Sequence, residues 1–262
     1  MLTVTDSEAH AETAQAPHRS VLWRAASIID AFNGSHRVLS LNELSRRSYL
    51  PKSTAHRFAE QLLEIGWLER ELGGYRVGMR LFEVGTLAER RNKLRDKALP
   101  HLHSLAAQTG KAVNLGILDH YEVLYVDRVP VRDLQLPTRD GGRMPLTCTG
   151  IGKALLAYSS PEDIELVLGE PLPRLTEASI DDRAALEAEL ESIRRTGVAF
   201  DHEEACRGVS CIAAPIRGSG RAVAAISLTA ATEDFNPRLV PLVKRVADNI
   251  WADLFPRPRY SF

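Results

Sequence analysis

The sequence predicts an α+β protein of two domains, an N-terminal winged helix-turn-helix joined by a helix to a larger domain of helices and strands. Residues 18–78 suggest three helices followed by a glycine-centred hairpin, which is the element order of a winged helix-turn-helix. The remainder mixes strands and helices without regular βαβ alternation, which is typical of a largely antiparallel sheet. The charge divides similarly, because residues 18–100 carry a net +6 and residues 101–262 a net −4.

The composition is that of a globular protein with a substantial core. The chain has 262 residues, of which 44% are hydrophobic and 26% charged. Three cysteines, an odd number in a chain of this length, argue against a disulfide framework and for a reducing cytoplasm. We expect no membrane partner, because no apolar run is long enough to span a bilayer and the start lacks a secretory signal. Residues 1–17 are polar and are expected to form a disordered tail.

The first two helices of the N-terminal domain have clear boundaries. Ser20 can cap a first helix, and Gly34 can end it in the left-handed conformation that glycine adopts without a Cβ clash. Ser40 and Glu43 fit a capping box, in which each side chain satisfies a backbone N–H that the helix leaves free. This second helix is short, because Pro51 disfavours helical geometry in the residue before it.

The third helix is the candidate DNA-reading helix. Pro51 suits its first turn, Gly66 closes it, and apolar residues recur on one face at helical spacing. Arg57 can reach a guanine edge, while hydroxyls and N–H groups of the first turns can bind phosphate. If this helix is considered alone, the favoured interpretation is an ordinary amphipathic surface helix that does not bind DNA. The predicted DNA contacts of this helix are Lys52, Ser53, Thr54, His56 and Arg57.

The segment after Gly66 favours a DNA-binding helix over an ordinary surface helix. Two short strand-like pieces flank Gly73 and Gly74, a hairpin signal, and they carry Arg70 and Arg76. A helix-turn-helix followed by a basic hairpin is the order of a winged helix, whose hairpin arginines can contact phosphate or the minor groove. Residues 79–95 then predict a connecting helix.

The C-terminal part is predicted to contain four strands and five helices. Helices are expected over residues 99–108, 152–158, 163–168, 182–195 and 237–254. Strands are expected over residues 112–118, 122–129, 211–217 and 222–229, with turns at 119–121 and 218–220.

Several blocks in both parts closely resemble the IclR-type transcriptional regulators. In the N-terminal part these are residues 20–25, 41–47, 50–57 and 75–78; in the C-terminal part they are residues 123–128, 144–146, 152–157 and 210–215. The resemblance implies a winged helix-turn-helix over 18–78, a linker helix over 79–95 and a GAF-like effector-binding domain over 96–256. It also implies a homodimer or homotetramer, and a regulator, more often a repressor than an activator, that binds an operator in double-stranded DNA.

The loop before the helix at residue 152 is the candidate effector site. Gly150 and Gly152 can leave backbone N–H groups open at a helix start, which attracts anions, so a small organic acid is the expected effector. The resemblance implies the individual contacts. Backbone N–H groups would come from Gly150 and Ile151, polar contacts from Asp201, Cys211, Ser227 and Thr229, and an apolar wall from Met144 and Val209.

Two other classes of function compete with this interpretation. Cys148, His202 and Asp201 could form a nucleophile, a base and an orienting acid, but no nucleophile signature surrounds Cys148. His101, His103, Cys206 and Cys211 could form a zinc site, but their spacing fits structural zinc sites poorly. We therefore expect no catalytic residue, no metal and no cofactor.

Overall fold

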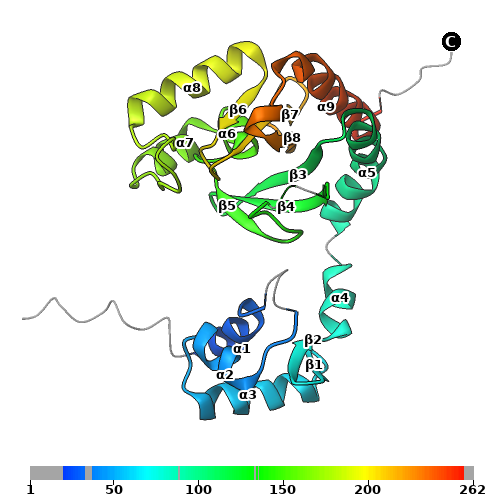
Figure 1. Cartoon of the computed structure of the whole chain (residues 1–262), viewed down its shortest axis with the longest axis vertical. Helices are drawn as coiled ribbons and strands as arrows, with labels where there is room; N and C mark the ends of the chain where they lie inside the picture. Colours follow the sequence, from blue (N-terminus) through cyan, green and yellow to red (C-terminus); the bar gives the residue numbers. More distant parts are fainter. Residues whose placement is uncertain (1–19, 33–36, 88, 133, 135, 257–262) are drawn as a thin grey trace, which may run out of the picture. The chain divides into compact units, whose positions relative to one another are not determined.

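The computed structural model describes residues 20–32, 37–87, 89–132, 134 and 136–256. The chain forms two compact units, residues 1–88 and 89–262, which we describe separately (Figure 1). The predicted tail over residues 1–17 and the helix end at Gly34 lie outside the described residues. Among the described helices, none combines the length and apolar character that crossing a membrane requires.

The N-terminal unit is a winged helix-turn-helix. Its elements are α1 (Val21–Asp30), α2 (Leu41–Arg47), α3 (Lys52–Glu64), β1 (Leu68–Glu71), β2 (Gly74–Val77) and α4 (Met79–Gly85). The capping box forms as predicted, since Glu43 Oε2 accepts from Ser40 N at 2.9 Å and Ser40 Oγ accepts from Glu43 N at 3.4 Å. Leu39 and Tyr75 exchange two 2.9 Å backbone hydrogen bonds, which tie the hairpin to the start of α2.

The connection after the hairpin differs from the single helix expected over residues 79–95. Helix α4 ends at Gly85, and a separate 21-residue helix, α5, runs from Glu89 to Thr109. Glycine is a poor helix former, which accounts for the break. A helix starting near Pro100 was also wrong, because Pro100 lies inside α5. Buried side chains on both sides of Pro100, including Ala98 and Leu102, hold α5 together across the missing N–H.

The C-terminal unit is built on a six-stranded antiparallel sheet in the order β5-β4-β3-β8-β7-β6. The strands are β3 (Ala112–Asp119), β4 (Glu122–Val129), β5 (Arg143–Pro145), β6 (Ala199–His202), β7 (Val209–Ile216) and β8 (Ala224–Ala231). The edge strands β5 and β6 were not predicted, because three or four residues are too short to show an alternating pattern. The curled sheet has the GAF-like form that the family resemblance implied.

Helices cover both faces of this sheet (Figure 1). They are α6 (Gly150–Leu156), α7 (Pro161–Leu168), α8 (Arg183–Thr196) and α9 (Val240–Leu254), with 3-10 turns at Thr232–Asp234 and Pro237–Leu239. Leu115, Ile212 and Ile226 point to the face covered by α5 and α9. Residues of opposite parity, such as Ala213 and Ala225, point to the face covered by α6, α7 and α8. Four polar or thiol side chains of these strands share that second face: Asn114, Cys211, Ser227 and Thr229.

Candidate functional site: a DNA-reading helix and an effector cavity

The first turns of α3 present the predicted DNA-binding side chains to solvent. Lys52, Ser53, His56 and Arg57 are exposed, and Thr54 is half-buried. The opposite side of α3 is buried in the core of the unit through Ala55, Phe58, Ala59 and Leu62. No described carboxylate forms an ion pair with Lys52 or Arg57. These two cations are therefore available to nucleic acid.

The two hairpin arginines lie in a different electrostatic setting. Arg76 bonds to Glu69 at 2.7 and 2.9 Å and to Glu71 at 2.9 Å, and Arg70 bonds to Glu60 at 2.6 Å. Glu69 faces Arg76 across the β1–β2 ladder, so the alternating charges Glu-Arg-Glu of β1 were the signal for this pairing. Any phosphate contact by Arg76 competes with two carboxylates. The hairpin therefore offers less unpaired positive charge than the start of α3.

Strand register builds the second site, on the α6 face of the sheet. Cys211 on β7 pairs with Asp201 on β6 on one side and with Thr229 on β8 on the other. Asn114 on β3 pairs with Ser227 on β8, one step along the same face. Because side chains alternate between the two faces, this register brings all five polar side chains to one side of the sheet.

These side chains line a cavity of about 30 Å³. All eight residues predicted for the effector site line it: Met144, Gly150, Ile151, Asp201, Val209, Cys211, Ser227 and Thr229. The sequence reasoning missed eight further lining residues: Asn114, Tyr125, Leu136, Pro137, Thr138, Thr149, Ala205 and Cys206. Asn114 could have been found, because it interrupts an otherwise apolar strand. Its Nδ2 donates to Ser227 Oγ and Thr229 Oγ1, both at 3.1 Å.

Asp201 is the carboxyl group of the cavity, and its pKa is raised. Its Oδ1 accepts from the backbone N–H groups of Glu204 at 2.8 Å and Ala205 at 3.4 Å. Burial raises the pKa of Asp201 to about 7, and the nearby charge of Glu204 adds to the rise. Burial also raises the pKa of Cys211 and of Tyr125, so both remain neutral near pH 7.

The glycines of α6 serve close packing as well as hydrogen bonding. The N–H of Gly152 is not open as predicted, because it donates to Thr149 Oγ1 at 3.0 Å, the helix cap. A Cβ on Gly152 would collide with the backbone carbonyl of Leu146. A Cβ on Gly150 would lie 2.8 Å from Cys211 Sγ. Both positions require glycine because the helix start presses directly on its neighbours.

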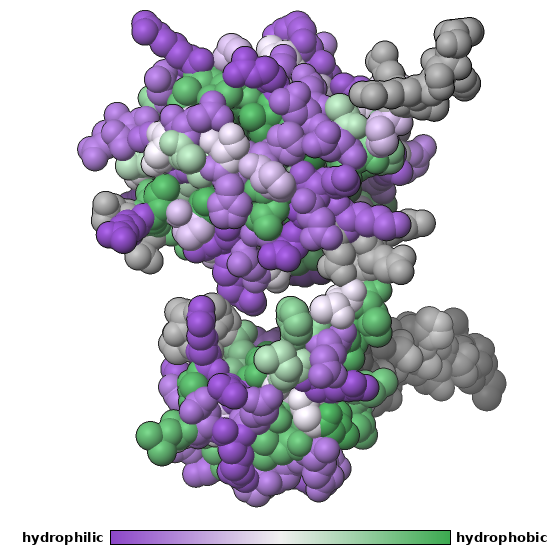
Figure 2. Space-filling model, turned by 90° about the vertical axis from the view of Figure 1, so that its right-hand side faces the viewer, coloured by the Kyte–Doolittle hydropathy of each residue, from purple (hydrophilic) through white to green (hydrophobic). Residues whose placement is uncertain are grey.

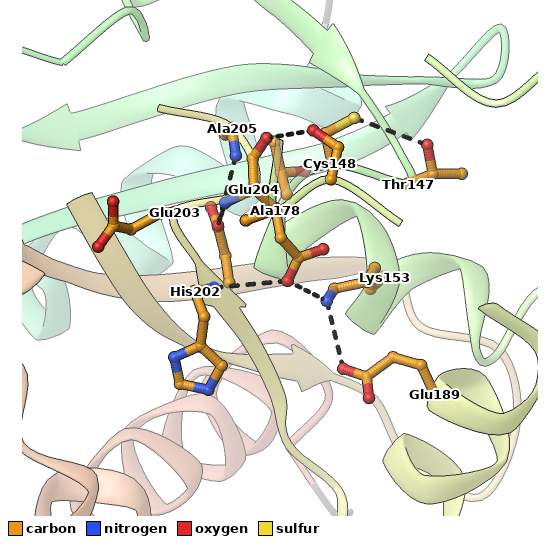
Figure 3. Close-up of polar contacts among 12 residues, drawn as sticks. Thr147, Cys148, Lys153, Ala178, Glu189, His202, Glu203, Glu204 and Ala205 are labelled. Atoms are coloured by element: carbon orange, nitrogen blue, oxygen red, sulfur yellow. Dashed lines mark hydrogen bonds and ion pairs between the residues drawn. The ribbon is translucent and has the colours of Figure 1, made fainter. Parts of the chain in front are cut away.

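A buried lysine supports the cavity from the same helix. Lys153 is 1% exposed, and its Nζ lies 2.6 Å from Glu204 Oε1 and 3.2 Å from Glu189 Oε1 (Figure 3). Glu204 belongs to the loop whose N–H groups hold Asp201, so the lysine connects α6, this loop and α8. The sequence shows only a single lysine in an apolar helix and does not reveal that Glu189 and Glu204 are its partners. Lys153 was therefore missed.

The residues of the alternative enzyme and zinc hypotheses are engaged elsewhere. Cys148 is buried, its Sγ lies 3.1 Å from Pro173 O, and burial raises the pKa of its thiol, which disfavours the reactive thiolate. His202 is exposed and stacks on Phe200 at 5.6 Å. In the described part of the chain, no group of three or more potential ligands is arranged to hold a metal ion.

Comparisons with known proteins identify the family. Residues 87–251 match the family model of the bacterial transcriptional regulator IclR C-terminal domain, and residues 21–72 match that of the IclR helix-turn-helix domain. The HTH-type transcriptional regulator XynR of Escherichia coli is 34% identical over 80% of this chain and 85% of that protein. The Transcriptional repressor IclR of Escherichia coli is 31% identical over 79% of this chain and 78% of that protein.

A solved structure extends the likeness to the fold. The structure of an IclR homolog complexed with 4-hydroxybenzoate, from Microbacterium hydrocarbonoxydans, has a TM-score of 0.80 and 32% identity. The alignment covers 90% of this chain and 99% of that one. Both domains and their order along the sequence therefore agree with this family. The chain belongs to the IclR family of DNA-binding transcriptional regulators.

Proposed function

We propose that this regulator is a cytoplasmic repressor without enzymatic activity, which binds its operator through the first turns of α3 and releases it on binding a small organic acid. The residues proposed to contact DNA are Lys52, Ser53, Thr54, His56 and Arg57 of α3, with weaker help from Arg70 and Arg76. The site proposed for the acid is the cavity on the α6 face of the sheet. One observation carries this assignment: all eight residues selected from the sequence line that single cavity.

The chemistry of the cavity suits a carboxylate with an apolar body. Hydroxyls of Ser227 and Thr229 and backbone N–H groups of Gly150 and Ile151 are hydrogen-bond donors for an acid, while Met144 offers an apolar surface. The related protein from Microbacterium hydrocarbonoxydans forms a complex with 4-hydroxybenzoate, which is an acid of this class. The neutral state of Cys211 keeps a negative charge away from the carboxylate.

The effector assignment predicts a measurable role for one hydroxyl. In calorimetric titrations with 4-hydroxybenzoate, we expect Thr229→Val to weaken binding by roughly 5- to 15-fold, the loss of about one hydrogen bond. The substitution keeps the shape of the side chain, and Asn114 Nδ2 keeps its bond to Ser227 Oγ, so the fold should be maintained. The matched control is Thr109→Val at the end of α5, away from the cavity, which should bind like the wild type. Equal affinity in all three proteins would contradict the assignment.

The raised pKa of Asp201 predicts pH-dependent binding. Below a pKa of about 7 the carboxyl is protonated and neutral, and above it the ionised carboxyl repels an anionic effector. Affinity for 4-hydroxybenzoate should therefore hold steady at lower pH and fall by up to about tenfold per pH unit above pH 7. Asp201→Asn keeps an oxygen for the N–H of Glu204 but cannot ionise, so its affinity should stay level. A pH-independent wild type would refute this prediction.

We also propose that the protein acts as a homodimer or a dimer of dimers through its N-terminal unit. Large apolar side chains are exposed there on α1 and α4, including Leu22 (81%), Met79 (64%) and Phe82 (69%). Figure 2 shows hydrophobic surface on this unit. A protein with two DNA-reading helices would bind two half-sites about one helical turn, ~34 Å, or a multiple apart. Light scattering should give a dimeric or tetrameric mass that Phe82→Glu reduces. A monomeric wild type that binds its operator tightly would overturn this proposal.

A further inference from the structure

A second hollow lies in the C-terminal unit, away from the effector cavity. It is a groove of about 320 Å³ between the end of α8, the turn after β7 and the middle of α9. Its lining shares no residue with the effector cavity. The groove is ten times the volume of that cavity and falls within the usual size of small-molecule sites.

The groove gathers positive charge in a part of the chain that is negative overall. Arg194 and Arg195 come from the last turn of α8, Arg217 from the turn after β7 and Lys244 from α9, against one carboxylate, Asp248. None of the four cations forms an ion pair with a carboxylate in the described residues. Their neighbours in the same unit behave differently: Arg143, Arg183 and Arg221 each pair with a carboxylate.

Backbone contacts hold two of these guanidinium groups in place from their inner side. Arg194 Nε donates to Ala157 O at 2.7 Å, and Arg217 Nε donates to Gly220 O at 3.0 Å. The guanidinium of Arg217 also stacks 4.0 Å from the ring centre of Tyr158. Because both bonds use Nε, the terminal nitrogens stay available as a fork of donors.

A purely structural role explains only part of the cluster. Cations at the end of a helix stabilise its dipole, and Lys244 Nζ bonds to Thr196 O at 2.6 Å, at the end of α8. That role accounts for Arg194, Arg195 and Lys244. It does not account for Arg217, which belongs to another element and stacks on Tyr158 while its Nε bonds to Gly220 O.

We propose that this groove is a second ligand site, which binds a small molecule through a phosphate group. Three guanidinium groups and an ammonium group in one groove match the double charge of phosphate better than the single charge of a carboxylate. Through this site the C-terminal domain would respond to a second ligand, distinct from the organic acid. It is independent of the effector cavity, because no residue is common to both.

The test uses the full chain in a buffer without phosphate or sulfate. Phenyl phosphate and inorganic phosphate are titrated separately by calorimetry, so that a phosphate monoester and free phosphate are distinguished. We expect saturable binding of at least one of them, weakened about tenfold by Arg217→Gln and by Arg194→Gln. The matched control is Arg183→Gln, at the other end of α8 and already paired with Glu165, which should bind like the wild type.

Three outcomes would overturn the proposal. The first is the lack of saturable binding of either phosphate. The second is an equal loss in all three variants, which would indicate a diffuse effect of charge. The third is a lowered melting temperature in Arg194→Gln with unchanged phosphate binding, which would assign the cluster to stabilising α8. Binding of 4-hydroxybenzoate, measured on the same samples, reports separately on the effector cavity.

Discussion

Replacing Lys153 with methionine is expected to lower the free energy of unfolding by about 3–5 kcal/mol. The side chain is 1% exposed and lies between Glu204 and Glu189, so its removal leaves the carboxylate of Glu204 buried without a counter-charge. Glu204 Oε2 already has no hydrogen-bond partner, which increases the cost. Urea unfolding followed by circular dichroism measures the change. Because the Glu204 loop holds Asp201, affinity for 4-hydroxybenzoate should fall as well.

Two further variants distinguish the contribution of the Lys153 charge to stability from the contribution of its packing. Glu189→Gln removes the outer carboxylate, which is 30% exposed and 3.2 Å away, and should cost less than about 1 kcal/mol. Adding Glu204→Leu to Lys153→Met removes the stranded charge and should recover more than about 1 kcal/mol of the loss. A double variant no more stable than Lys153→Met would show that packing, and not the buried charge, causes the loss.

Replacing Arg57 with alanine is expected to weaken operator binding by about 1–3 kcal/mol, or roughly 5- to 150-fold in Kd. Arg57 is exposed on α3 and has no carboxylate partner among the described residues, so its guanidinium can bond to a guanine edge. Binding to random DNA should change much less, because a base contact contributes nothing there. Fluorescence anisotropy with operator and random duplexes at fixed salt measures both affinities.

Two arginine variants serve as comparisons for Arg57→Ala. Arg76→Ala should weaken operator and random DNA alike and by less, since Arg76 is already neutralised by Glu69 and Glu71. Arg80→Ala, on α4 and paired with Glu83, should leave both affinities unchanged. Equal losses on operator and random DNA for Arg57→Ala would show that Arg57 contacts phosphate and does not read a base.

The fold was predictable wherever local signals were strong. The capping box at Ser40, the helix predicted over residues 182–195, and the four predicted strands all appear as expected. Pro100 misled the prediction, because proline at the first turn of a helix and proline inside a long packed helix look alike in sequence. Helix α5 is decided by burial of its flanking side chains, which is a property of the folded unit.

The effector cavity was predictable only in part, for a similar reason. Family resemblance selected residues on β6, β7 and β8, but Asn114 contributes through its register with Ser227, which depends on strand pairing. Lys153 contributes through Glu204, 51 residues later in the chain. Such long-range polar pairs follow from tertiary packing, whereas capping and periodicity are local.

The size of the cavity sets a condition on how an effector can act. At about 30 Å³ it is much smaller than the roughly 150 Å³ void that accommodates benzene in another protein. Under the proposed assignment, an aromatic acid would have to push the walls apart as it enters, at a cost to its binding energy. It would then bind the expanded form better, and wall residues such as Leu136 and Met144 would determine how far the equilibrium between the two forms moves. Replacing a wall residue by a smaller one would then raise the affinity for the acid and reduce the effect of the acid on operator binding.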